Sequence, residues 1–251
     1  MTPEVPDSIS PVTTSAISFT GLANRFTKPP GKLYLLYGDP LVFRLSLALA
    51  SQALASDMSI AVVDGCNRFD AHSIARFARQ RSIDPDVLLN RIFVSRGFTC
   101  YQMEAAITSR LFPMLECIDS RVALIFGLLD TFYDEQAPLR ETTHMLDRII
   151  AALRSMKSRG ISILLACKHW NVIPKERNNL FTTLKTNVDS VYRLEPDEQS
   201  KPQLFLESAV AARKSISAIG LLKYGFEKMN SPRSLPKGSL PRSGHFVAGP
   251  L

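Results

Sequence analysis

Short apolar runs alternate with longer helical patterns along this chain, and this alternation constrains its fold more than any other feature. Five runs have the length and composition of buried strands: residues 33–37, 60–63, 92–94, 122–126 and 161–166. Four longer stretches have the composition or the apolar spacing of helices: residues 41–55, 70–81, 102–118 and 141–159. Strands that alternate with helices are typical of a parallel sheet covered on both faces. The sequence therefore predicts an α/β fold with a mostly parallel β-sheet.

The end of the alternating region has a different period. Residues 188–194 and 203–206 alternate between apolar and polar side chains, which predicts a C-terminal antiparallel hairpin. Pro113 predicts a kink or a break within the third helix, and Gly160 predicts the end of the fourth. We expect three parts of the chain, namely a loose leader over residues 1–28, a core domain over 29–210 and a tail over 211–251.

The basic excess of the chain is concentrated in this tail. The net charge is +7, and the tail accounts for +6 of it, because it holds seven basic residues against Glu227 alone. The seven are Arg213, Lys214, Lys223, Lys228, Arg233, Lys237 and Arg242. After Asn230 the composition is rich in Ser, Pro and Gly, as in disordered tails. A basic tail favours polyanionic partners such as DNA, with a solubilising role as the alternative.

Composition also excludes several classes of protein. No stretch approaches the roughly 18 consecutive apolar residues of a membrane span. The polar first residues lack the basic and apolar regions of a secretory signal. The four cysteines lie far apart, without the spacing of a zinc site or a disulfide framework: Cys66, Cys100, Cys117 and Cys167. We therefore expect a cytoplasmic protein without a metal site, whose cysteines are small buried residues.

The segment between the first predicted strand and the first predicted helix has the position of a phosphate-binding loop. Such a loop has the pattern GxxxxGK[ST], and the corresponding residues here run from 38 to 45. Gly38 matches the first glycine, and Phe43 replaces the second. Arg44 replaces the lysine, and Leu45 replaces the hydroxyl that holds Mg²⁺. Gly38 and Arg44 are therefore the candidate nucleotide-binding residues that remain.

The order of segments around this loop resembles the RecA/RadA recombinase family and its paralogues. The resemblance extends from about residue 31 to 208 and includes GKLYLLYGDP, IAVVDGCNRFD, VALIFGLLDTFYDE and RIIAALRSMKSRGISILLACKHW. Its most specific part is DPDVLLNRIFVSRGFTCYQM, residues 84–103, which is similar to the family's DPDEVLDRI stretch and the strand after it. The resemblance implies a RecA-like ATPase core.

The catalytic positions that this resemblance implies hold other residues. Cys66 stands at the position of the general base, Gly127 at that of the Walker B aspartate, and Lys168-His169 at that of the γ-phosphate sensor. A neutral thiol does not orient water as a carboxylate does. Loss of one positioned electrostatic group costs on the order of 10²–10³ in rate, so we expect these changes together to abolish ATP turnover.

The resemblance also implies two loops that face DNA. The corresponding stretches are residues 131–142, which hold three acidic residues against Arg140, and residues 169–186. The second stretch contains Lys175, Arg177 and Lys185, and it is the better candidate for contacts with phosphates. An ordinary loop of mixed charge is the alternative interpretation.

Other polar groups near the predicted strand ends have simpler explanations. Two sets contain the groups of a thiol site or a metal site: Asp64, Cys66, His72 and His169 for the first, and Asp130, Asp134 and Glu135 for the second. The sequence does not bring the first set together, and the second is typical of a solvated acidic loop. Trp170 has a ring that can stack on a base, although a tryptophan in the core or at its rim is the simpler interpretation.

These observations together predict a catalytically silent RecA-like protein that acts as an accessory factor in DNA recombination or repair. Its expected partners are DNA, through the tail and residues 169–186, and a recombinase or polymerase. Bound to DNA, it would be associated with the nucleoid. We expect no cofactor, with ATP bound but not hydrolysed as an alternative. Two further functions stay open: a protein-interaction module without DNA binding, and a divergent ATPase that uses Arg44.

Overall fold

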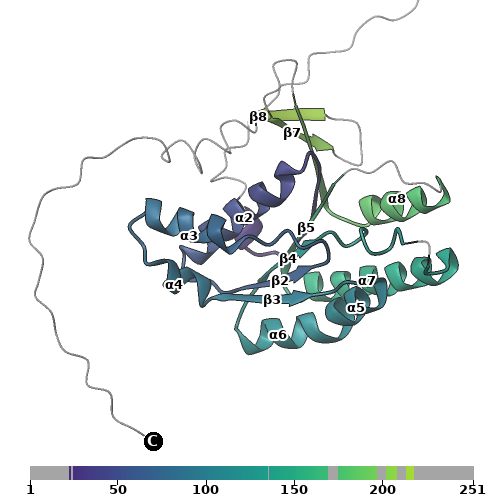
Figure 1. Ribbon diagram of the computed structural model, residues 1–251, viewed down its shortest axis with the longest axis horizontal. Helices are drawn as coiled ribbons and strands as arrows, with labels where there is room; N and C mark the ends of the chain where they lie inside the picture. Colours follow the sequence, from purple (N-terminus) through teal and green to yellow (C-terminus); the bar gives the residue numbers. More distant parts are fainter. Residues whose placement is uncertain are drawn as a thin grey trace, which may run out of the picture.

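A computed structural model describes residues 23, 25–134, 136–168, 175–196, 202–207 and 213–217, the last range by its backbone alone. These residues form one twisted β-sheet with helices packed on both of its faces (Figure 1). The predicted α/β class is therefore confirmed. The tail residues after 217 and most of the expected leader lie outside the described residues.

Eight strands build the sheet of the described chain. Their bounds are β1 Leu33–Gly38, β2 Ile60–Asp64, β3 Ile92–Arg96, β4 Val122–Phe126, β5 Ser162–Lys168, β6 Ser190–Pro196, β7 Pro202–Glu207 and β8 Arg213–Ser217. In space they follow the order β3-β2-β4-β5-β1-β6-β7-β8. The strands from β3 to β6 in this order are parallel, whereas β6 with β7 and β7 with β8 pair antiparallel. Both the parallel sheet and the C-terminal hairpin are as predicted.

The helices divide between the two faces of the sheet. Their bounds are α2 Leu41–Leu54, α3 Ala71–Gln80, α4 Pro85–Leu89, α5 Cys100–Ala105, α6 Leu111–Cys117, α7 Leu139–Ser158 and α8 Asn178–Thr186. Helices α2, α3 and α4 cover one face, and α5 to α8 cover the other (Figure 1). The result is a three-layer arrangement in which the sheet separates two apolar cores.

Strand β1 shows why the sequence of a central strand is apolar throughout. Tyr34 and Leu36 pack into the core under α2, and Leu33, Leu35 and Tyr37 pack into the core under α7 and α8. All five side chains are buried. A strand that is covered on both faces has no position for a solvated side chain, so a continuous apolar run replaces the alternation of an exposed sheet.

Local signals in the sequence set the ends of two helices. At the start of α3, a carboxylate oxygen of Asp70 accepts the backbone N–H of His72 at 2.9 Å, as an N-cap does. At the end of α7, Gly160 has a φ of +84°, a conformation that glycine adopts without strain. The helix over these residues therefore ends where the sequence predicts.

The third predicted helix is irregular. A single π-helical segment, Ala106–Arg110, separates α5 from α6. Pro113 lies in the first turn of α6, shortly after this segment. Residues 100–117 are helical without a gap, and Leu111 N–H donates to Ala106 O, so the irregularity is a π-helical turn and not a break.

The folded region extends beyond the expected boundaries at both ends. Phe26, which the sequence assigns to the leader, is buried, and its ring lies 5.8 Å from that of Tyr34 in an edge-to-face contact. Strand β8 lies past the expected core boundary at residue 210. It still belongs to the sheet, because it pairs with β7 along its whole length. Helix α8 occupies residues that the sequence assigns to a loop. Phe26 and β8 contact segments that are close in the sequence, whereas Arg177 beside α8 bonds the distant segment before α7.

The carboxyl ends of four parallel strands meet at one edge of the sheet. In the register, Asp64 of β2 pairs with Phe126 of β4, and Phe126 pairs with Ala166 of β5. The connections continue this pairing, since Gly65 N donates to Phe126 O at 2.8 Å and Gly127 N donates to Ala166 O at 2.9 Å. Ligands of open α/β sheets bind at this carboxyl edge, which is therefore the candidate site.

Candidate functional site

The turn after β1 is set by a close approach of two strands. Gly38 has a φ of +119°, and a Cβ at this position would lie 2.2 Å from the carbonyl oxygen of Leu194 in β6. The next residue, Asp39, donates its backbone N–H to the same oxygen at 2.9 Å. Gly38 is therefore needed for packing between β1 and β6, whether or not a phosphate binds.

This turn is too short to form a phosphate-binding loop. Such a loop places four residues between its two glycines, but here α2 already begins at Leu41, directly after Asp39 and Pro40. Asp39 Oδ1 accepts the N–H of Leu41 at 2.8 Å, and Asp39 O accepts that of Val42 at 2.9 Å. The amides that would hold a phosphate are thus bonded within the turn. The Asp39 carboxylate adds a negative charge where the helix N-terminus favours an anion.

The ring of Phe43 fills the space next to this turn on the side of the core. Phe43 is buried and packs edge-to-face on Phe126, with ring centroids 5.5 Å apart. The guanidinium carbon of Arg68 lies 5.9 Å from the centroid of the Phe43 ring. Arg44, the next residue in α2, is exposed. The ring therefore joins α2 to the end of β4, at the position where the family motif has a glycine.

Asp64, at the end of β2, is structural. It is buried, and its carboxylate accepts the backbone N–H groups of Cys66, Arg68 and Phe69 at 3.2, 3.1 and 2.9 Å. A buried carboxylate is stable when such donors satisfy its oxygens. Asp64 therefore holds the loop after β2 in shape, and both of its oxygens are engaged in doing so.

Cys66 and Gly127 fit together as a pair. A Cβ at Gly127 would lie 2.4 Å from the Cys66 Cβ and 2.5 Å from its Sγ, and Gly127 has a φ of +61°. The two positions that the family resemblance assigns to the general base and the Walker B aspartate are thus in contact. Burial, with the nearby Asp130 and Asp64 carboxylates, raises the pKa of the Cys66 thiol. The thiol is neutral at pH 7, so the geometry gives no support to the thiol-site alternative.

Asp130, in the segment after β4, is the unusual titratable group of this edge. Its Oδ1 is buried and accepts no hydrogen bond from the described residues. Burial raises the pKa of the Asp130 carboxyl, although the positive charges of Lys168 and Arg68 act in the opposite direction. The sequence assigned Asp130 to a solvated acidic loop. Within the described ranges, no three His, Cys, Asp or Glu side chains gather as a metal ion would require.

The three basic residues expected to contact DNA from residues 169–186 have different environments. Arg177 is buried and donates to the carbonyl oxygens of Phe132 and Ala137, both at 2.6 Å. Its guanidinium therefore does not face solvent, because it holds the segment between β4 and α7. Lys185 forms an ion pair with Glu207 and donates to the hydroxyl of Tyr37 at 3.3 Å. Lys175 is exposed.

Other predicted residues are placed only in part. Arg213 and Lys214 lie on β8, where the backbone alone is described. The remaining basic residues of the tail lie outside the described residues, as do Glu135, His169 and Trp170. His72 is exposed on α3, and Asp134 is exposed with Oδ1 accepting the N–H of Gln136 at 3.0 Å.

A second surface lies at the β3 end of the sheet. Among the described strands β3 is an edge strand, and five large apolar side chains near it are exposed: Val87, Phe93, Val94, Phe98 and Tyr101. Phe98 is the most exposed of them, at 70%. Exposed apolar side chains next to an uncovered edge strand are a feature of surfaces that bind other chains.

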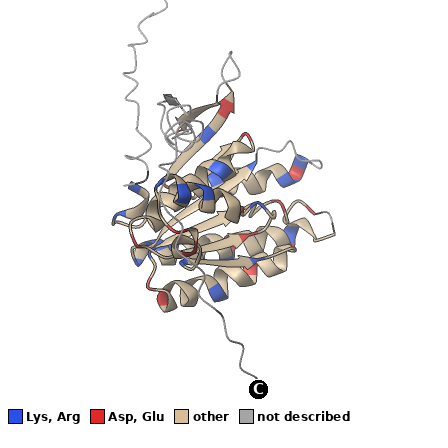
Figure 2. Cartoon of the chain, turned by 60° about the vertical axis from the view of Figure 1, so that its left-hand side comes forward, with Lys and Arg blue, Asp and Glu red and all other residues tan. Residues whose placement is uncertain are grey.

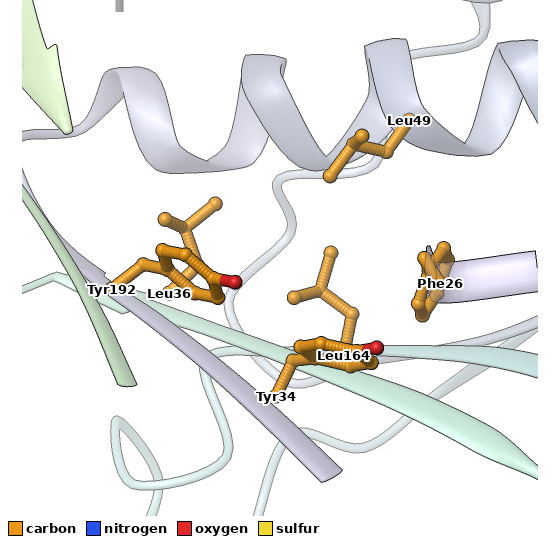
Figure 3. A pocket seen from close by; sticks show the side chains of 6 residues that line it. All are labelled: Phe26, Tyr34, Leu36, Leu49, Leu164 and Tyr192. Carbon is orange, nitrogen blue, oxygen red and sulfur yellow. The ribbon is translucent and has the colours of Figure 1, made fainter. Parts of the chain in front are cut away.

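A small cavity lies between α2 and the sheet, away from this edge (Figure 3). Its lining consists of Phe26, Tyr34, Leu36, Leu49, Leu164 and Tyr192. The space is about that of a single water molecule. Burial raises the pKa of Tyr34 to about 12, and its hydroxyl donates to Arg25 O at 3.0 Å. The cavity is a packing space under the segment that contains Phe26, too small for an organic ligand.

The fold and this edge define an α/β protein whose phosphate-loop position is closed. No model of a known protein family and no curated protein sequence matches the chain. No helix of the described residues is both long and apolar enough to cross a membrane. The function must therefore be inferred from the side chains themselves.

The sequence contained one indication that the turn after β1 is short, since an Asp-Pro pair often marks the start of a helix.

Proposed function

We propose that this chain is a catalytically silent RecA-like protein that acts by binding, as an accessory factor in DNA recombination or repair. The observation that carries the proposal is the closed turn between β1 and α2, in which Asp39 takes the amide that a phosphate would use. The contact between Cys66 and Gly127 supports it, because it leaves no room for an acidic side chain at 127.

The distribution of charge supports DNA as a partner. Residues 211–251 hold seven of the basic residues and one acidic residue. Binding to a nucleic-acid backbone releases counterions from the phosphates, so such a segment would bind with an affinity that falls steeply as salt rises. The core region before residue 211 carries a net charge close to zero, and the tail is therefore the first candidate for this contact.

Thermal denaturation with Mg-ATP tests the silent site. We expect no shift of Tm at roughly millimolar nucleotide. A ligand at about 100 times its Kd would stabilise the fold by about 2.7 kcal/mol, which is roughly 5–11 °C for a domain of this size. A shift of that kind that disappears in Arg44→Ala would contradict the proposal and favour a divergent ATP-binding protein.

Binding of fluorescent DNA, followed by anisotropy over a range of salt concentrations, tests the DNA contact. We expect affinity for DNA that decreases linearly on logarithmic scales as salt rises from about 50 to about 200 mM. Absence of binding to both single-stranded and duplex DNA at the lowest salt would remove DNA from the proposal.

A protein-interaction module is the second candidate function, and the surface at β3 favours it. Phe93 and Phe98 are exposed beside an edge strand, where an extended segment of a partner protein can pair by strand addition. We would recover partners of wild-type and Phe98→Ser proteins after nuclease treatment. One stoichiometric protein that is retained by the wild type and lost by the variant would favour this function over DNA binding.

A further inference from the structure

We propose that the free edge of strand β3 pairs with the same edge of a second copy of this chain, antiparallel and around a two-fold axis at Val94. Such a dimer joins the sheets of the two copies into one continuous sheet. The inference rests on the second candidate function, which takes the surface at β3 as a binding surface, and it deepens that function by naming the partner. It does not depend on DNA binding.

The exposed large apolar side chains of the described chain all lie in one short stretch, which we call the β3 edge surface. They are Val87 of α4, Phe93 and Val94 of β3, Phe98 directly after β3 and Tyr101 of α5. The strand lies between the two helices both in the chain and in space, so these side chains follow one edge of the molecule (Figure 1). A concentration of exposed apolar side chains is a feature of surfaces that another chain covers.

Strand β3 is exposed on both of its faces. Ile92 pairs with Ile60 of β2 and packs against the core under α2, so Val94 lies on that same face. Phe93 lies on the opposite face, because successive side chains of a strand alternate. Phe93 is 38% exposed and Val94 is 40% exposed. A helix laid against one face would leave the other uncovered, whereas a second sheet edge with its own helices covers both.

The backbone of β3 directs hydrogen-bonding groups away from the sheet at alternate residues. Arg91 O accepts the N–H of Ile60 at 2.9 Å, and Gly97 N donates to Asp64 O at 3.2 Å. The odd-numbered residues of this stretch therefore face β2, because successive residues direct their N–H and C=O groups to opposite sides of a strand. The residues that face outward are Ile92, Val94 and Arg96. No described strand lies on that side of β3.

One antiparallel register uses all three outward-facing residues. Pairing around Val94 places Val94 opposite Val94 of the second copy, and Ile92 opposite Arg96 of the second copy. The two residues of each such pair exchange two hydrogen bonds, so this register forms about six. A shift by two residues would leave one of the three unpaired. On the other face, Phe93 then lies opposite Ser95 of the second copy.

The charges at the two ends of the surface are complementary under this symmetry. Arg96 at the end of β3 and Asp86 in the first turn of α4 are exposed, and neither forms an ion pair with another described residue. Arg96 shares a face of β3 with α4, and the register places it beside the strand that follows α4 in the second copy. Two equivalent contacts between Arg96 and Asp86 then flank the apolar centre, as in isologous interfaces. Basic and acidic positions are both present on the side that Figure 2 brings forward.

The two edge strands of the described sheet differ in their protection against pairing. Residues 92–95 of β3 contain neither a charged residue nor a proline. Strand β8, at the other edge, begins with Arg213 and Lys214. Charged residues on an edge strand disfavour its pairing with another chain. Of the two edges, β3 is therefore the one suited to a second copy.

Sedimentation velocity of the full-length chain, from about 1 to about 100 μM, measures the dimer directly. We expect a monomer–dimer equilibrium for the wild type. We also expect a Tm that rises with protein concentration, because association stabilises the folded state by mass action. A wild type that stays monomeric over this whole range would overturn the inference.

Charge reversal tests the antiparallel geometry. In Asp86→Arg and in Arg96→Asp, both contacts between positions 86 and 96 become repulsive, so each variant alone should dimerise at least about tenfold more weakly. A mixture of the two variants should form a heterodimer with the affinity of the wild type, because each contact then joins one basic and one acidic side chain. Wild-type dimerisation by either variant alone, or a mixture that stays monomeric, would overturn the pairing.

Two further variants separate pairing from folding. Val94→Pro removes an N–H that faces away from β2, so it should abolish the dimer and leave the pairing of β2 with β3 in place. Glu176→Arg reverses an exposed charge directly before α8, which packs on β1, and three strands lie between β1 and β3. This control should dimerise like the wild type. The charge variants should match the monomeric wild type in Tm within about 2 °C, measured at the lowest concentration.

The outcomes also separate this inference from the second candidate function. If the wild type is monomeric but retains a different protein that Phe98→Ser loses, the edge binds that protein, and the second copy is overturned while the candidate function stands. If the wild type dimerises and Arg96→Asp does not, the inference holds whether or not a different protein is recovered. If neither a dimer nor a partner protein is found, both fail.

Discussion

At the scale of single residues, the side chains at the carboxyl edge depend on one another. Cys66 fills the space above Gly127, and an aspartate could not be introduced at Gly127 without displacing it. Phe43 packs on Phe126 at the end of the same strand. Because interiors are close-packed, each of these side chains limits what its neighbour can be. The carboxyl edge is therefore filled by packing side chains that fit one another.

Asp130 is a residue of this edge whose burial is only partly offset by the positive charges of Lys168 and Arg68. Its Oδ1 is buried and has no hydrogen-bond donor among the described residues, and burial raises its pKa. A carboxyl whose pKa is higher in the folded state contributes stability that is complete below its unfolded pKa and is lost as pH rises through its folded pKa. We expect Asp130→Asn to raise Tm at pH 7 by about 2–4 °C, which corresponds to about 1 kcal/mol.

The pH dependence of this effect provides the control. The gain in Tm should shrink as pH falls toward about 4, where the wild-type carboxyl also becomes neutral. Asp147→Asn, on an exposed position of α7, should leave Tm unchanged over the same range. A lower Tm for Asp130→Asn at pH 7 would mean that the carboxylate has a stabilising partner after all.

At the scale of elements, a buried guanidinium next to α8 adds to the apolar contacts of Leu180 and Leu184 that hold this helix against the rest of the fold. Arg177, directly before α8, bonds two carbonyls of the segment between β4 and α7. We expect Arg177→Ala to lower stability by about 2–4 kcal/mol, because two buried carbonyls lose their donors. Lys175→Ala, two residues earlier and exposed, should change stability by less than about 0.5 kcal/mol. Urea denaturation of the two variants measures the difference.

The variants Arg177→Ala and Lys175→Ala also test whether this segment binds DNA. If residues 169–186 contact phosphates as the sequence predicts, both variants should weaken DNA binding to the same extent while folded. We expect Lys175→Ala to have the larger effect on DNA binding per folded molecule, since the Arg177 side chain is buried.

In the urea experiment, equal stability of the two variants would contradict the anchoring role of Arg177.

At the scale of the whole molecule, the sheet continues further along the chain than its hydrophobic pattern indicates. Strand β8 pairs with β7 over Gln203–Glu207 and follows the expected core boundary. A chain that ends after Ser217 should therefore keep the full-length Tm, whereas one that ends after Val210 should lose about 2 kcal/mol, or roughly 4–8 °C. Identical Tm values for the two truncated chains would show that β8 adds nothing to the stability of the sheet.

Much of the fold follows from patterns that a single strand or helix carries in itself. The apolar runs of β1, β2, β4 and β5 predict buried parallel strands because a strand covered on both faces can hold only apolar side chains. The stop at Gly160 predicts a helix end through local backbone chemistry. The predicted helix over residues 70–81 begins at Asp70, which caps it in the structure. The π-helical turn before α6 was indicated only as a kink or a break at Pro113.

The sequence by itself determined the α/β class and the order of strands β1 to β7 along the chain. Only the tertiary structure decided which charged side chains are exposed. Arg177 and Arg76 are both arginines among polar neighbours, yet one is buried on two carbonyls and the other faces solvent. Exposure depends on contacts between segments far apart in the chain, and these contacts leave no periodic trace in the sequence around each residue.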